Sequence, residues 1–80
     1  MKLYEFEIGQ TVVDKFGNIY EVKNVSHKED DYQPVQLLCI KNSHSKNYVT
    51  KSHCSSYEFK AGCEWWINED ELEDFSIVEN

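Results

Sequence analysis

The 80-residue sequence predicts a single, mainly β domain over residues 1–80. We expect about five short antiparallel strands in a small barrel, with a short helical turn before the last strand. Runs of β-branched and aromatic residues recur along the chain, and turns containing glycine or asparagine separate several of them. The most helix-like segment, residues 68–74, is long enough for only one or two turns. The core of so short a chain is modest, and its aromatic residues supply much of it.

The N-terminal part of the chain predicts a β-hairpin on which the other strands assemble. Residues Thr11–Val13 and Ile19–Val22 are mostly β-branched or aromatic, and Gly17-Asn18 between them tolerates the positive φ of a tight turn. The alternation of apolar and polar residues slips after Val22, which indicates a bulge near Lys23-Asn24. We therefore expect two paired strands, the second of them bent.

The later strands are predicted from shorter signals. Residues 35–40 follow Pro34 and are apolar at nearly every position, which predicts the most buried, central strand. Residues 41–56 are rich in Lys, Asn, Ser and His, so we expect an exposed loop, or loosely twisted strands around residues 48–50. Tyr57 and Phe59 share one face of a further strand, and residues 63–67 and 75–78 complete the set. Asn68 is a suitable helix cap for the acidic turn between these last two strands.

Charge is distributed unevenly along the chain. The net charge is −7, and residues 58–80 hold one lysine against eight acidic residues, so they account for the whole excess. Between Tyr32 and Tyr57 there is no acidic residue, and the chain has no arginine. Clustered Lys and Arg supply affinity for phosphates, and Arg reads base edges, so direct nucleic-acid binding by the C-terminal region is disfavoured. The acidic residues also promote solubility.

Other classes of function lack their sequence signals. There is no apolar run of the ~18 residues that a membrane helix needs and no signal segment, so we expect a cytoplasmic protein with no membrane partner. No nucleophile elbow or phosphate loop is present, so we predict no enzyme activity, no catalytic residue and no cofactor. Cys39, Cys54 and Cys63 are expected to be reduced thiols. They lack paired zinc-ligand spacing, although with His44 or His53 they leave the question of zinc open.

Two segments resemble known small barrels. Gly9–Asp14 followed by Gly17–Val22 resembles the opening of KOW- and Tudor-like SH3-type barrels, and Trp66–Glu73 is similar to the closing strand and turn of small phage and prophage proteins built on that barrel. The resemblance implies a non-enzymatic binding module with an SH3-like fold, located in the host cytoplasm if it is encoded by a phage. The chain lacks the basic loop residues of the nucleic-acid-binding members.

The acidic run beside the tryptophans is the first candidate site. An aromatic residue rimmed by carboxylates suits a basic protein surface, above all one that normally holds nucleic acid. We therefore expect an interaction module, in its sharpest form an inhibitor that carries DNA-like charge and covers a basic site on a host or defence protein. The predicted partner-binding residues are Trp66, Glu69, Asp70, Glu71, Glu73 and Asp74.

Three alternatives stay open at this point. The basic segment 41–53 favours a weak nucleic-acid- or transcription-associated module, whose contacts would be Lys41, Lys46, Tyr48 and Lys51. An outward-facing Trp together with Tyr48 or Tyr57 would form an aromatic cage for a methylated cation. A structural or virion-associated subunit is the third class, and it would assemble with itself. Neither the partner nor the oligomeric state follows from the sequence.

Overall fold

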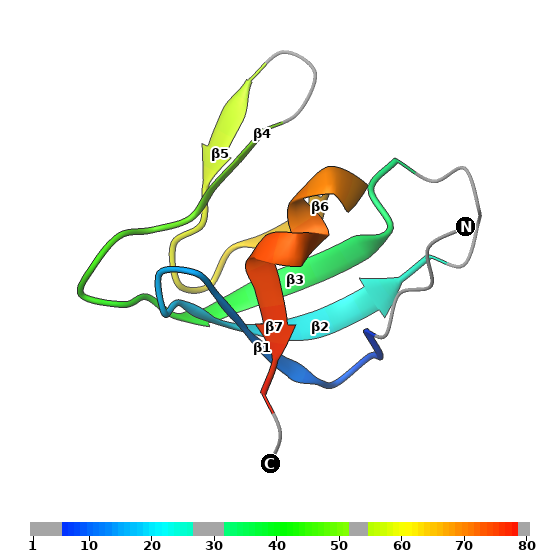
Figure 1. Ribbon diagram of the computed structural model, residues 1–80, viewed down its shortest axis with the longest axis horizontal. Coiled ribbons are helices and arrows are strands. Elements are labelled where there is room, and N and C mark those ends of the chain that lie inside the picture. Colours follow the sequence, from blue (N-terminus) through cyan, green and yellow to red (C-terminus); the bar gives the residue numbers. More distant parts are fainter. Residues whose placement is uncertain (1–5, 27–31, 52–54, 79–80) are drawn as a thin grey trace.

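The computed structural model describes residues 6–26, 32–51 and 55–78 of the chain (Figure 1). These described residues form a five-stranded antiparallel sheet, a two-stranded hairpin and one 3₁₀ helix. The sheet strands are β1 (Thr11–Asp14), β2 (Ile19–Val25), β3 (Val35–Lys41), β6 (Glu64–Ile67) and β7 (Phe75–Ile77). The hairpin strands are β4 (Val49–Lys51) and β5 (Ser56–Glu58), and the 3₁₀ helix η1 (Glu69–Asp74) leads directly into β7.

The strand order of the sheet is β6-β3-β2-β1-β7, and every neighbouring pair is antiparallel. The mainly β fold, the N-terminal hairpin and the helical turn before the last strand are therefore confirmed. The β2–β3 register shifts between Val22 and Asn24, which confirms the bulge expected there. No pairing joins β6 to β7 among the described residues, so closure of the sheet into a barrel does not follow from these pairings.

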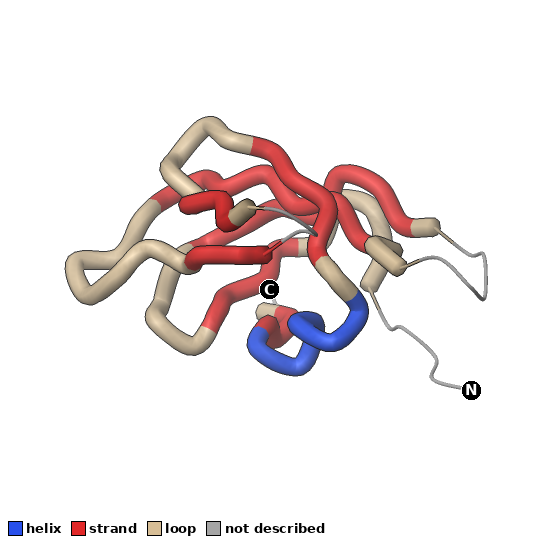
Figure 2. Tube along the Cα trace, turned by 90° about the horizontal axis from the view of Figure 1, so that it is seen from above, coloured by secondary structure: helices blue, strands red, loops and turns tan. Residues whose placement is uncertain are grey.

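The core lies between one face of the sheet and a second layer that contains η1 and the segments adjoining the β4–β5 hairpin (Figure 2). Tyr20 on β2 lies near its centre and makes edge-to-face contacts with Phe59 and Phe75, each with ring centroids 5.3 Å apart. Leu72 attaches η1 to this core. Aromatic pairs of this geometry add about 0.5–1.5 kcal/mol each to the free energy of unfolding beyond area burial.

The β1–β2 turn is held by a buried carboxylate. Asp14 Oδ1 accepts hydrogen bonds from the backbone N–H groups of Phe16 and Asn18, while its Oδ2 accepts from Asn18 Nδ2 and from the Tyr20 hydroxyl, all within 2.7–3.0 Å. Gly17 has a φ of 91°, which glycine adopts without strain. The turn is therefore rigid, and the loop before β4 is tied to it because Asn18 Nδ2 also donates to the carbonyl oxygen of Lys46.

Two predictions about the strands are confirmed only in part. Among the described strands β3 buries the most side chains, as expected, and residues 49–51 form a strand, which was one of the two alternatives for that segment. The central strand is β2, whereas β3 lies one place from the edge and buries only alternate side chains. Ile40 is 49 % exposed because the outer face of the sheet has no second layer among the described residues. The segment before and within β4 is not simply exposed either, since Tyr48 and Thr50 are both buried.

Candidate functional site

The acidic helix η1 divides its side chains among three ridges. In a 3₁₀ helix, residues three apart lie above one another. Leu72 is buried and Glu71 and Asp74 are half-buried, whereas Asp70 and Glu73 are exposed together on one ridge. Glu69 at the start of the helix is exposed as well. Of the acidic residues predicted from the sequence, three are accessible to a partner and two face the protein.

The two inward-facing acids accept hydrogen bonds from the β4 segment. Thr50 Oγ1 donates to Glu71 Oε1 at 2.5 Å, and the Tyr48 hydroxyl donates to Asp74 Oδ2 at 2.7 Å. Burial, followed by the hydrogen bond to Asp74, raises the pKa of Tyr48 above its ordinary value. A buried hydroxyl needs such a partner, so these carboxylates contribute to the fold itself.

The side chain of Trp66 lies on the face of β6 that points away from the core and from η1. Its neighbours Trp65 and Ile67 belong to or pack against the core, so the Trp66 side chain projects from the opposite face of β6, in register with Gln36. One tryptophan inward and one outward is what the sequence predicted. The expected single patch of Trp66 and five acids is instead distributed over two sides of the β6–η1 segment.

Neither Tyr48 nor Tyr57 forms an aromatic cage with an outward-facing tryptophan. Tyr57 stacks on the inward Trp65, with ring centroids 4.3 Å apart and planes 16° apart, so no cation fits between these rings. Tyr48 is 4 % exposed, and its ring contacts Phe16 and Phe75. Among the described residues, Trp66 makes no ring contact with either tyrosine. Trp65 Nε1 is buried without a hydrogen-bond partner among the described residues.

Lys41, Lys46 and Lys51, the lysines of the alternative nucleic-acid site, each lie beside different parts of the described structure. Lys41 is at the end of β3, and Lys51 is beside the acidic helix, where Asn68 Nδ2 donates to its carbonyl oxygen. Lys46 instead lies against Phe16, its Nζ 5.2 Å from the ring centroid. Tyr48 is buried with its hydroxyl bonded to Asp74, so that hydroxyl is already engaged within the protein.

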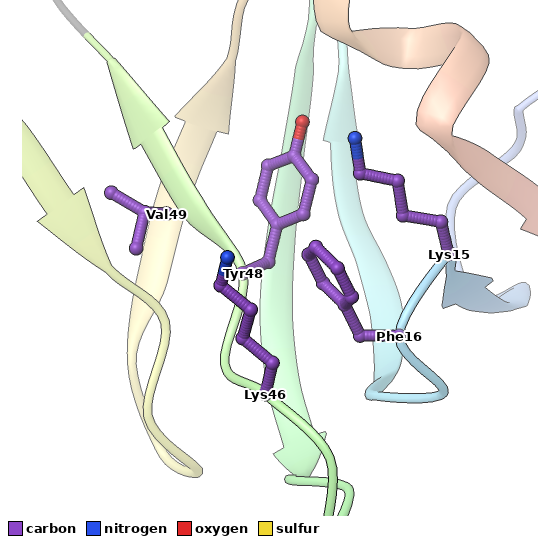
Figure 3. A pocket seen from close by; sticks show the side chains of 5 residues that line it. All are labelled: Lys15, Phe16, Lys46, Tyr48 and Val49. Carbon is purple, nitrogen blue, oxygen red and sulfur yellow. The ribbon is translucent and has the colours of Figure 1, made fainter.

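A shallow pocket lies between the β1–β2 turn and the segment that leads into β4. Its volume is about 220 Å³, and Figure 3 shows the five side chains that line it. Lys46 and Tyr48 were predicted from the sequence as contacts of the alternative site. Their approach to Lys15 and Phe16 was not predicted, because the β1–β2 turn and the segment before β4 are far apart in the chain. The lining residues are Lys15, Phe16, Lys46, Tyr48 and Val49.

Two of the three cysteines, Cys39 and Cys63, lie within the described residues. Cys39 and Cys63 are free thiols on neighbouring strand segments, joined by a backbone hydrogen bond from Cys39 N to Cys63 O at 2.9 Å. Burial raises the pKa of the Cys39 thiol, which lowers its reactivity. Within residues 6–26, 32–51 and 55–78 no group of three or more His, Cys, Asp or Glu could hold a metal ion. His53 and Cys54 lie outside the described residues.

Comparisons with known proteins assign no relative. No protein-family model, curated protein or solved structure matches the chain. In the part of the chain that the structure describes, no helix is long and apolar enough to cross a membrane. The described residues define a small mainly β domain with an acidic helix and a lysine-flanked pocket.

Proposed function

We propose that this protein is a non-enzymatic, protein-binding module with an SH3-like fold, whose acidic helix engages a basic surface of a nucleic-acid-handling protein. A five-stranded antiparallel sheet with a 3₁₀ helix before the last strand supports that fold. The observation that carries the proposal is the outward exposure of Glu69, Asp70 and Glu73 on a helix that is fixed in place.

The fixed helix is what makes the acidic ridge suitable for recognition. Leu72 anchors η1 in the core, and Thr50 and Tyr48 hold its inner carboxylates. The outward carboxylates are therefore presented on a backbone that loses little conformational entropy on binding. Rows of negative charge of this kind complement a surface evolved for phosphates, and they accelerate association by electrostatic steering. An inhibitor of phage or mobile-element origin that covers such a surface is the sharpest form of the proposal.

The test is capture of partners from lysate of the native host, at moderate salt and after nuclease treatment, followed by mass spectrometry. The wild-type chain should retain a nucleic-acid-handling protein, and reversing the outward acids should abolish that capture while leaving the fold intact. The test variant carries Glu69→Lys, Asp70→Lys and Glu73→Lys. If it captures the same protein equally well, recognition does not depend on these three charges.

A matched control separates local recognition from overall charge. Glu7, Glu21 and Glu64 lie away from η1, on the N-terminal segment, β2 and β6, and replacing them with lysine changes the net charge by the same amount. This control should still capture the partner. Loss of every partner on nuclease treatment would instead favour the nucleic-acid-associated module, and recovery of the chain alone would favour a self-assembling structural subunit.

A further inference from the structure

The lysine-flanked pocket is built from two segments that meet at one end of the sheet. Lys15 and Phe16 come from the β1–β2 turn, whereas Lys46, Tyr48 and Val49 come from the segment that leads into β4. Figure 3 shows the Phe16 ring between the two lysine side chains, with the Tyr48 ring beside it. The Nζ atoms of Lys15 and Lys46 are 5.5 Å and 5.2 Å from the Phe16 ring centroid. Cation–π attraction of this kind stabilises both lysines in these positions.

Partly buried hydrogen bonds fix the walls of the pocket before any ligand binds. Asp14 Oδ1 accepts the backbone N–H of Phe16 at 2.8 Å, and Asn18 Nδ2 donates to the carbonyl oxygen of Lys46 at 2.7 Å. The Tyr48 hydroxyl is held by Asp74. A pocket fixed in this way binds with a smaller entropic cost than one formed by mobile loops.

The two lysines differ in whether a carboxylate lies near the ammonium group. Lys15 Nζ lies 3.7 Å from Asp74 Oδ2, so part of its charge is already compensated. Lys46 forms no ion pair with the described residues, and its ammonium group remains available for an anion. Next to it, Val49 is 44 % exposed, which places an apolar surface beside an uncompensated cation. The pocket therefore combines one apolar contact with one positive charge.

We propose that this pocket binds an acidic peptide segment of a partner protein, with one apolar side chain against Val49 and an adjacent carboxylate on Lys46. This is a contact separate from the acidic helix. A peptide fits better than a nucleic-acid strand, because lysines flank the Phe16 ring where a base would stack. The net charge of −7 also repels a polyanion, whereas a single carboxylate experiences mainly the nearby ammonium groups.

The test is an NMR titration of the ¹⁵N-labelled chain with the peptide acetyl-Leu-Glu-Leu-amide and with its neutral counterpart acetyl-Leu-Gln-Leu-amide. The glutamate peptide should shift the amide signals of Phe16, Lys46 and Val49. It should bind about threefold more tightly than the glutamine peptide, which is the effect of one surface ion pair. Equal affinity for the two peptides, or shifts confined to another surface, would overturn the proposal.

Two variants make the result specific to the pocket. Lys46→Gln should remove the preference for the glutamate peptide, whereas Lys60→Gln, a change of the same charge at an exposed site outside the pocket, should leave it. If Lys46→Gln keeps the preference, Lys46 is not the anion site. A short oligothymidylate that shifts the same amides with higher affinity would identify a nucleic-acid subsite instead. Neither variant alters the acidic helix, so these outcomes are independent of the proposed function.

Discussion

The hydroxyl group of Tyr48 lies 2.7 Å from Asp74 Oδ2 and donates a hydrogen bond to it. This contact joins the segment before β4 to the end of the acidic helix, and it lies between the two surfaces described above. One side of Tyr48 lines the pocket, while its hydroxyl holds an inner carboxylate of η1. The same residue therefore orients the outward ridge of the helix and forms a wall of the pocket.

Stability should fall at alkaline pH because of this tyrosine. The folded state raises the pKa of Tyr48 above 10.0, so the folded chain keeps a proton that the unfolded chain loses. The free energy of unfolding therefore decreases as pH rises above about 10, by up to about 1.4 kcal/mol per pH unit for each such tyrosine. Tyr20, also with a raised pKa, acts in the same direction. In urea unfolding between about pH 9 and pH 11, Tyr48→Phe should show the shallower decline, and an unchanged slope would contradict this assignment.

The ridge of Glu71 and Asp74 and the ridge of Asp70 and Glu73 should differ in their effect on stability. Replacing Glu71 and Asp74 with alanine removes the acceptors of two hydrogen bonds from hydroxyl groups, and we expect a loss of about 1 kcal/mol for each in the free energy of unfolding. Replacing the exposed Asp70 and Glu73 with alanine should change it by less than about 0.5 kcal/mol. Chemical denaturation of the two double variants compares them directly. Equal losses would mean that the ridges are not divided as described.

Asp14 should be one of the most sensitive positions in the chain. Asp14→Ala leaves the buried Tyr20 hydroxyl and the Asn18 side-chain amide without their shared acceptor, and each unsatisfied group costs about 1–3 kcal/mol. A loss of about 3 kcal/mol or more is expected, which is a large part of the stability of a small domain. Tyr20→Phe, which removes one donor and leaves the carboxylate its other partners, should cost clearly less. Thermal unfolding of both variants would show a reversed order if the network were unimportant.

The adjacent tryptophans should respond very differently to truncation. Trp65 packs against the core and stacks on Tyr57, so Trp65→Ala should lower the free energy of unfolding by about 3 kcal/mol. Trp66 projects from the outer face of β6, and Trp66→Ala should cost about 1 kcal/mol or less. Urea titrations followed by far-ultraviolet circular dichroism give both values. A larger loss for Trp66 would mean that the alternation along β6 had been assigned to the wrong faces.

Local signals predicted the local structure well. The turn at Gly17-Asn18, the bulge after Val22 and the start of β3 after Pro34 each depend on a few adjacent residues, and all three are confirmed. The position of β3 was mispredicted because a continuous apolar run predicts burial on both faces, whereas the outer face of this sheet is open. Ile40 sits at a register shift on that face.

The parts of the site that sequence reasoning missed depend on distant partners. Tyr48 and Thr50 were expected on an exposed segment, but their hydroxyl groups reach carboxylates 26 and 21 residues further along the chain. Those bonds also explain why the acidic run is not a uniformly solvated face. In a 3₁₀ helix the three-residue period places Asp70 and Glu73 on one ridge and Glu71 and Asp74 on another. The sequence alone did not predict which of these two ridges would face the protein.

The measurement that tests the central claim most directly is the affinity of the captured partner for matched neutral variants of the chain. With the outward acids replaced as Glu69→Gln, Asp70→Asn and Glu73→Gln, we expect binding at least about tenfold weaker, a loss of about 1.4 kcal/mol, with an unchanged unfolding temperature. The same number of neutral substitutions at Glu7, Glu21 and Glu64 should leave the affinity within about twofold. Equal affinities for the two variants would contradict recognition through the acidic helix.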